Sequence, residues 1–140
     1  MTWNTENLEF LKHSQSSLRH LFDYCFHAVS FSSGDYCLTE SFHASCLKNE
    51  VIFMTSATYG RMRIGRCVKA EEVDAHKAIV GDDPRYLGCS ADVLQKLDQK
   101  CSGKTDCKFR VYDILDENIQ PCVPGLKMYL EASYKCIYGM

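Results

Sequence analysis

The chain has 140 residues, of which 46% are hydrophobic and 24% charged, a balance typical of one globular domain. Sixteen basic residues against eighteen acidic ones give a formal net charge of −2, so the totals show no basic footprint for nucleic acid. No apolar run approaches the roughly 18 residues that a membrane-spanning helix needs. The first thirty residues lack a basic start followed by an apolar block, so no secretory signal is expected there. The signal has been removed, or the chain is a fragment, or the protein stays inside the cell.

Residues 1–33 have the periodicity of a helix. Apolar side chains recur at steps of three and four across residues 8–29, and residues 32–34 are a suitable stop. Two interpretations are open. One is a helix that packs on the main domain, and the other is a short coiled coil that forms a homodimer through residues 8–29 with Cys25 at the seam. We prefer the first, because three heptads are the lower limit for predicting a coiled coil.

Residues 34–140 have the pattern of a second, compact domain. The run 51–59 is rich in strand-forming residues and is expected to be a strand. Residues 68–88 form a long, charged connection with a turn at Asp82-Asp83-Pro84. The acidic pair Glu71-Glu72, like the pair in that turn, is expected to be solvated surface.

A helix and two further strands follow. Ser90 is a suitable N-cap for a helix whose apolar face reaches Cys101. Another strand is expected from Phe109 to Tyr112, and a last one over residues 126–136, where apolar and polar side chains alternate. Strands around one clear helix indicate an α+β fold.

Nine cysteines are spread widely along the chain, at positions 25, 37, 46, 67, 89, 101, 107, 122 and 136. No two of them form a C-x-x-C, so zinc knuckles and thioredoxin-type redox pairs have no local support. The scattered spacing is typical of a disulfide framework, which belongs to a secreted or extracellular protein. The alternative is a cytosolic protein with buried free thiols. Because nine is odd, one thiol is left over or pairs with another chain.

The sequence offers no catalytic constellation. Gly103-Lys104-Thr105 is similar to the end of a phosphate-binding loop, but Asp98 stands where that motif needs a glycine. No Gly-x-Ser-x-Gly elbow is present, and His43 and His76 are isolated. We therefore expect a protein that is not an enzyme, with no cofactor and no metal.

One group of motifs points to a family. Ala57-Thr58-Tyr59-Gly60-Arg61 closes a hydrophobic strand, Cys101 and Cys107 bound a C-x5-C loop, and Pro121-Cys122 precedes the ending Leu130-Glu131-Ala132-Ser133-Tyr134-Lys135-Cys136. With these motifs, the stretch from Cys37 to Cys136 resembles the SUEL-type lectin domain, also called the galactose- or rhamnose-binding lectin domain. That family includes sea-urchin and fish egg lectins and domains of latrophilin-type adhesion receptors.

The resemblance implies a compact, disulfide-stapled antiparallel sheet with one or two helices, preceded here by the helical extension. It also implies the pairs Cys37–Cys67, Cys46–Cys136, Cys89–Cys122 and Cys101–Cys107, which leave Cys25 as the odd thiol. The implied activity is non-catalytic recognition of galactose- or rhamnose-like glycans. Carboxylates and lysine suit this task, because sugar hydroxyls both donate and accept hydrogen bonds.

The implied sugar site is incomplete in this sequence. Tyr59 and Lys127 match the family's tyrosine and lysine, and Gly125 lies near its glycine, but an extra residue, Met128, separates Lys127 from Tyr129. Leu38 and Gln120 replace its two acidic residues, and Glu40 and Asp116 are candidates to replace a lost carboxylate.

Two hypotheses follow. The first is a lectin of altered specificity, with a pocket formed by Tyr59, Gln120, Gly125, Lys127 and Glu40. The second is a module that binds a cell-surface protein and has lost the sugar site. Three simpler roles are also open: Tyr59 as a core residue, Arg61 as one partner of a structural salt bridge, and Lys127 as an ordinary exposed lysine.

Overall fold

The structure is a computed structural model that describes residues 30–114 and 118–139. The helix expected before residue 30, the dimer contacts, Cys25 and Asp116 lie outside these ranges. Strand β1 (Ser30–Cys37) begins inside the expected helical extension. The prediction of helix and turn for residues 30–33 is therefore wrong, since they belong to a strand. The pairing of β1 with β6 at the edge of a sheet outweighs the local sequence preference there.

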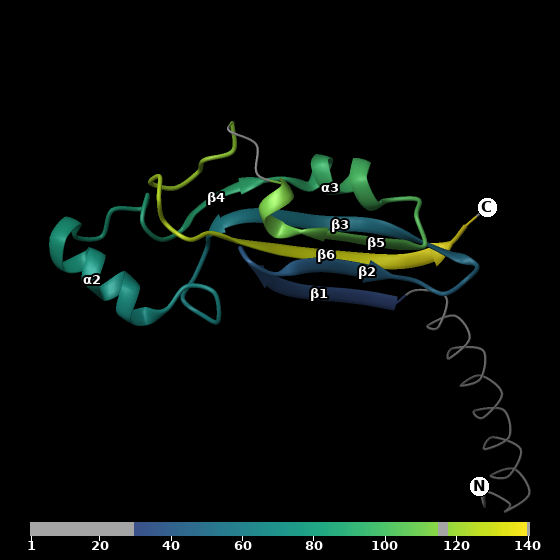
Figure 1. The fold of residues 1–140 in the computed structure, drawn as a ribbon, viewed down its shortest axis with the longest axis horizontal. Helices are drawn as coiled ribbons and strands as arrows, with labels where there is room; N and C mark the ends of the chain where they lie inside the picture. Colours follow the sequence, from purple (N-terminus) through teal and green to yellow (C-terminus); the bar gives the residue numbers. More distant parts are fainter. Residues whose placement is uncertain (1–29, 115–117, 140) are drawn as a thin grey trace, which may run out of the picture. The chain divides into compact units, whose positions relative to one another are not determined.

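Four strands form the larger sheet in the order β1-β6-β3-β4 (Figure 1). Strand β3 (Glu50–Arg61) runs antiparallel to β6 (Tyr129–Tyr138), with a bulge between Met54 and Ser56. Strand β4 (Cys89–Asp92) pairs only with the last four residues of β3. The long strand expected at 51–59 is confirmed, whereas β6 begins three residues later than expected, so Lys127 lies just before it.

A second, two-stranded antiparallel sheet contributes side chains to the same core. It consists of β2 (Ser41–Ser45) and β5 (Asp106–Arg110), and in each strand buried and exposed residues alternate. After Arg110 the chain forms the 3-10 helix η1 (Val111–Ile114) instead of continuing the expected strand. The buried core cluster is Phe42, Ala44, Ile52, Met54, Ala57, Tyr59, Val93, Leu97, Cys101, Cys107, Phe109, Val111, Ile114, Leu130 and Ala132.

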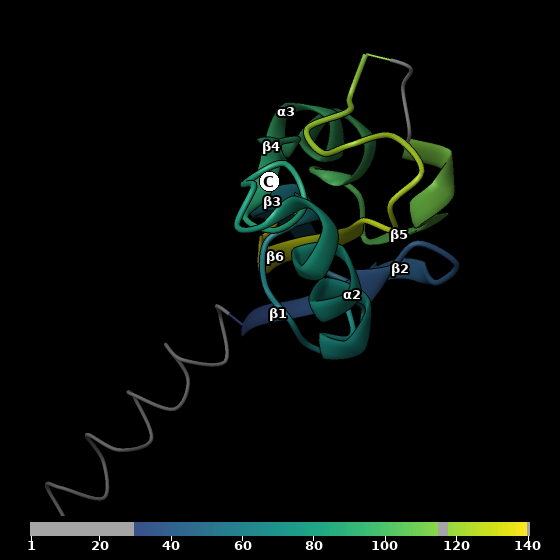
Figure 2. The same ribbon diagram turned by 90° about the vertical axis from the view of Figure 1, so that its left-hand side faces the viewer.

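Two α-helices complete this α+β domain. Helix α3 (Leu94–Cys101) buries Leu97 and Cys101 in the core. Its first turn is held by the Asp92 carboxylate, which accepts a hydrogen bond from the Leu94 amide at 2.8 Å, whereas the expected cap, Ser90, lies in β4. The charged connection contains helix α2 (Ala70–Val80), which has no fully buried residue. In two views α2 lies beyond the end of the larger sheet where β3 ends and β6 begins (Figures 1 and 2).

Four disulfides staple the domain: Cys37–Cys67, Cys46–Cys136, Cys89–Cys122 and Cys101–Cys107. These are the pairs that the resemblance implies. Across the described ranges, no helix has the length and apolar character needed to cross a membrane.

Candidate functional site

The residues expected to bind sugar gather toward one end of the larger sheet. Strand β3 ends there with the Tyr-Gly-Arg motif, β6 starts there, and the turn between β1 and β2 carries Glu40. The Cys37–Cys67 disulfide joins that turn to the loop that follows β3. Helix α2 lies at the same end, so four separate segments define the candidate site (Figure 2).

Tyr59 is part of the core at this end. It sits opposite Ala91 of β4 and Leu130 of β6, and only 1% of its surface is exposed. Burial raises the pKa of its hydroxyl to about 12, because the charged phenolate is poorly solvated there. The phenol is therefore a neutral packing group in this structure and is not part of the exposed surface.

Gly60 allows β4 to approach β3 closely. A Cβ atom at this position would lie 2.2 Å from the backbone oxygen of Cys89 and 2.7 Å from the Cα of Ser90. Both neighbours are backbone atoms, so no side-chain rotation could relieve the contact. The glycine of the motif is thus explained by strand packing.

Arg61, the last residue of β3, is buried at this end of the larger sheet. It is 2% exposed, and its Nε donates to the carbonyl of Tyr86 and its Nη1 to the carbonyl of Lys127, both at 2.7 Å. Burial lowers the pKa of the guanidinium, and the nearby charge of Glu72 partly opposes that shift. Arg61 thus makes two hydrogen bonds to backbone carbonyls in place of the expected salt bridge. These carbonyls belong to the loops before β4 and before β6, so one guanidinium connects both loops.

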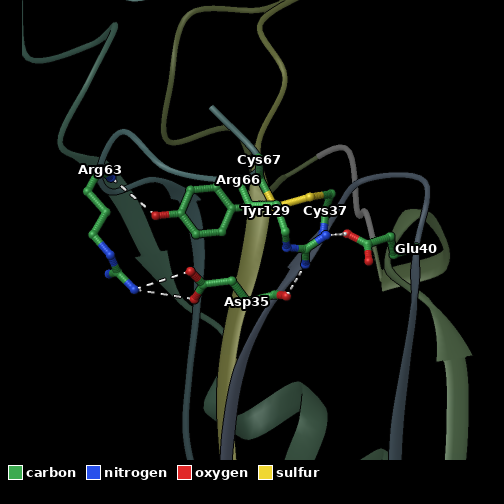
Figure 3. Close-up of a disulfide and its surroundings, with 7 residues drawn as sticks. All are labelled: Asp35, Cys37, Glu40, Arg63, Arg66, Cys67 and Tyr129. Carbon is green, nitrogen blue, oxygen red and sulfur yellow. Dashed lines mark hydrogen bonds and ion pairs between the residues drawn. A yellow bond between two sulfur atoms is a disulfide. The ribbon is translucent and has the colours of Figure 1, made fainter. Parts of the chain in front are cut away.

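Glu40 is held at the β1–β2 turn. Its Oε1 accepts hydrogen bonds from the Cys37 amide at 2.9 Å and from Arg66 Nη1 at 2.6 Å (Figure 3). The bond from Arg66 is the main reason that the pKa of this carboxyl lies below its usual range. Glu40 therefore carries a negative charge at neutral pH, but part of its hydrogen-bonding capacity is used within the protein.

Arg63 connects the loop after β3 to β1 and β6. Arg63 Nη1 donates to Glu131 at 2.7 Å. Its Nη2 contacts the Asp35 carboxylate at 3.3 Å, and its amide donates to the Tyr129 hydroxyl at 3.2 Å (Figure 3). Arg66 Nη2 also donates to the Asp35 carbonyl at 2.6 Å. These residues were missed at the sequence level, because their partners lie 28 to 68 positions away along the chain.

The Cys37–Cys67 disulfide and Glu40 together meet the distance requirement for a metal site. The sulfur atoms of Cys37 and Cys67 and a carboxylate oxygen of Glu40 lie within 4.8 Å of one another. The two sulfur atoms are bonded to each other and cannot act as thiolate ligands. The chemistry of this donor set therefore does not suit a metal ion.

The remaining predicted residues lie on the exposed segment before β6. The side chain of Lys127 is 72% exposed, and its Nζ lies 3.9 Å from Oε1 of Glu72 in α2. Gly125 has a φ of +88° with no atom near its missing Cβ, and Gln120 is exposed. In the described part of the chain, no hydrogen bond or ion pair joins Glu40, Gln120, Gly125 and Lys127 to one another.

Two antiparallel sheets, two helices and four disulfides define a compact α+β domain. The family model for the D-galactoside/L-rhamnose binding SUEL lectin domain matches residues 44–136, and the chain belongs to this family. The SUEL lectin domain is a carbohydrate-binding module.

Relatives of the chain are proteins called protein eva-1 homolog C. This chain is 30% identical to the human and chimpanzee proteins of that name over 101 residues, which are 72% of this chain and 21% of each relative. The mouse protein is 28% identical over 104 residues, with the same shares covered. The chain thus spans about a fifth of the length of the curated relatives it matches.

Proposed function

We propose that this domain is a non-catalytic recognition module for galactose- or rhamnose-like glycans in an extracellular setting. The observation that carries the proposal is the exposed ammonium group of Lys127, the residue that the sequence resemblance assigns to the family's sugar-binding lysine. Its one ion-pair partner among the described residues is a carboxylate 3.9 Å away, so its hydrogens are free to donate to a ligand.

The surrounding groups suit a shallow polar site. Gln120 offers both donors and acceptors, and Gly125 leaves open space beside the backbone, so that a sugar ring can approach closely. The four disulfides support an extracellular location, because such bonds persist in oxidising compartments. A single site of this kind binds weakly and gains strength through several copies.

A second candidate function is protein recognition on the same scaffold. Two observations favour it: Tyr59 is buried, and Glu40 already bonds to Arg66. Leu38 and Gln120 also stand where the family has acidic residues. On this alternative, the same end of the sheet would contact a cell-surface protein and bind no monosaccharide.

Substitution of Lys127 tests the glycan proposal. We expect Lys127→Ala to weaken binding to immobilised rhamnose or galactose about tenfold or more, since a charged hydrogen bond contributes about 1.5–3 kcal/mol. Folding should be retained, because the side chain is exposed and the carbonyl that Arg61 contacts is unchanged. Biolayer interferometry on the oxidised protein measures the change.

Lys104→Ala is the matched control. Lys104 is also exposed, but its carbonyl accepts a hydrogen bond from Ile52, near the start of β3 and away from the site. This variant should bind sugar as the parent chain does. Equal binding by both variants would remove Lys127 from the site.

A further inference from the structure

Helix α2 brings a carboxylate to the candidate site. Oε1 of Glu72 lies 3.9 Å from Nζ of Lys127, and the Glu72 side chain is only 38% exposed. Its neighbour Glu71 is exposed, and it forms no ion pair with any residue in the described ranges. Glu72 thus differs from the solvated surface residue that the sequence predicts, because the fold places α2 beside the start of β6.

Glu72 also interacts electrostatically with a buried cation, Arg61. Arg61 is fixed by two backbone carbonyls, and Glu72 is the carboxylate whose charge acts on its guanidinium. A buried charge is costly without a compensating opposite charge. Glu72 therefore interacts with two cations, the buried Arg61 and the exposed Lys127.

The separation between Glu72 and Lys127 fits a bridging hydroxyl. At 3.9 Å the two groups are too far apart for a direct hydrogen bond, which needs about 2.7–3.2 Å. An oxygen atom about 2.8 Å from each would accept from the ammonium and donate to the carboxylate. A sugar hydroxyl makes both bonds at once.

We infer that Glu72 is a glycan-contacting residue that clamps one sugar hydroxyl together with Lys127. The inference rests on the proposed function and specifies its chemistry. Glu72 would supply the carboxylate that the family places elsewhere, at the positions occupied here by Leu38 and Gln120. The ligand class is a pyranoside with a free hydroxyl at the clamp.

Paired substitutions in α2 test this inference. With methyl α-L-rhamnoside and methyl β-D-galactoside as probes, we expect Glu72→Ala to weaken binding of the recognised sugar about tenfold or more. Glu71→Ala removes the same charge one residue away and should leave affinity within about twofold. The alanine substitution also removes the charge that acts on the buried Arg61. If that variant is less stable, Glu72→Gln replaces it, because glutamine keeps the side-chain volume.

Deoxygenated sugars separate direct contact from an indirect effect of Glu72 on the position of Lys127. For the parent chain, one monodeoxy derivative of the recognised sugar should bind about tenfold or more weakly than the full sugar. For Glu72→Ala, the same derivative should lose clearly less affinity relative to the full sugar, since the bond to the carboxylate is already gone and only the bond from Lys127 remains to be lost.

Each outcome has a distinct meaning. Full binding by both Glu72 variants, with loss on Lys127→Ala, would overturn the clamp and leave the glycan proposal standing. A deoxy effect that persists undiminished in Glu72→Ala would overturn direct contact. A folded parent chain that binds neither probe would overturn both.

Discussion

Gly60→Ala is expected to destabilise the domain by about 3 kcal/mol or more. The added methyl group would lie 2.2 Å from the Cys89 carbonyl oxygen, well inside van der Waals contact, so β4 would have to move away from β3. That movement would break strand pairs and disturb the Cys89–Cys122 disulfide. Urea unfolding followed by circular dichroism measures the loss.

Gly65→Ala is the matched control for this prediction. No atom lies within 4 Å of a Cβ at position 65, and its backbone is not in the left-handed region. We expect its free energy of unfolding to stay within about 0.5 kcal/mol of the parent value. If the two alanine variants unfold at the same urea concentration, close strand packing is not the reason for glycine in the Tyr-Gly-Arg motif.

Removal of the Cys46–Cys136 disulfide should produce the second large loss. This bond closes a loop of 90 residues and joins the end of β2 to β6. In the chain-entropy description, a loop of that length contributes about 4–5 kcal/mol by restricting the unfolded chain. We therefore expect the Cys46→Ala/Cys136→Ala variant to be largely unfolded at 37 °C, as far-UV circular dichroism and thermal unfolding would report.

The Cys101–Cys107 disulfide provides the comparison. Its sequence separation is only 6, so the same description gives about 2 kcal/mol for its removal. The Cys101→Ala/Cys107→Ala variant should fold and lose about half as much stability. Equal losses in the two double variants would mean that loop length does not govern what these disulfides contribute.

Much of the fold could be predicted because its signals are local or carried by the family motif. The run that became β3 is rich in strand-forming residues, and the alternation in β6 has period two; both indicate a strand directly. The Tyr-Gly-Arg motif led to the family. Helix α2 was missed because no residue in it is buried, so it shows no apolar stripe at helical spacing.

The candidate site was only partly predictable. Lys127 was found because its motif position is local in sequence. Glu72 and Arg66 were missed because they are ordinary surface types, and only the tertiary fold brings them to Lys127 and Glu40. Tyr59 was ambiguous at the sequence level, since tyrosine serves equally in cores and in binding sites, and its burial depends on strands from three parts of the chain.

The most direct test of glycan recognition is a glycan array probed with the oxidised, folded domain, with free rhamnose and galactose as competitors. The account predicts binding to glycans that end in galactose- or rhamnose-like sugars, and loss of that signal when the matching free sugar is added. An absence of competed binding from protein with all four disulfides intact would contradict it and favour a protein partner.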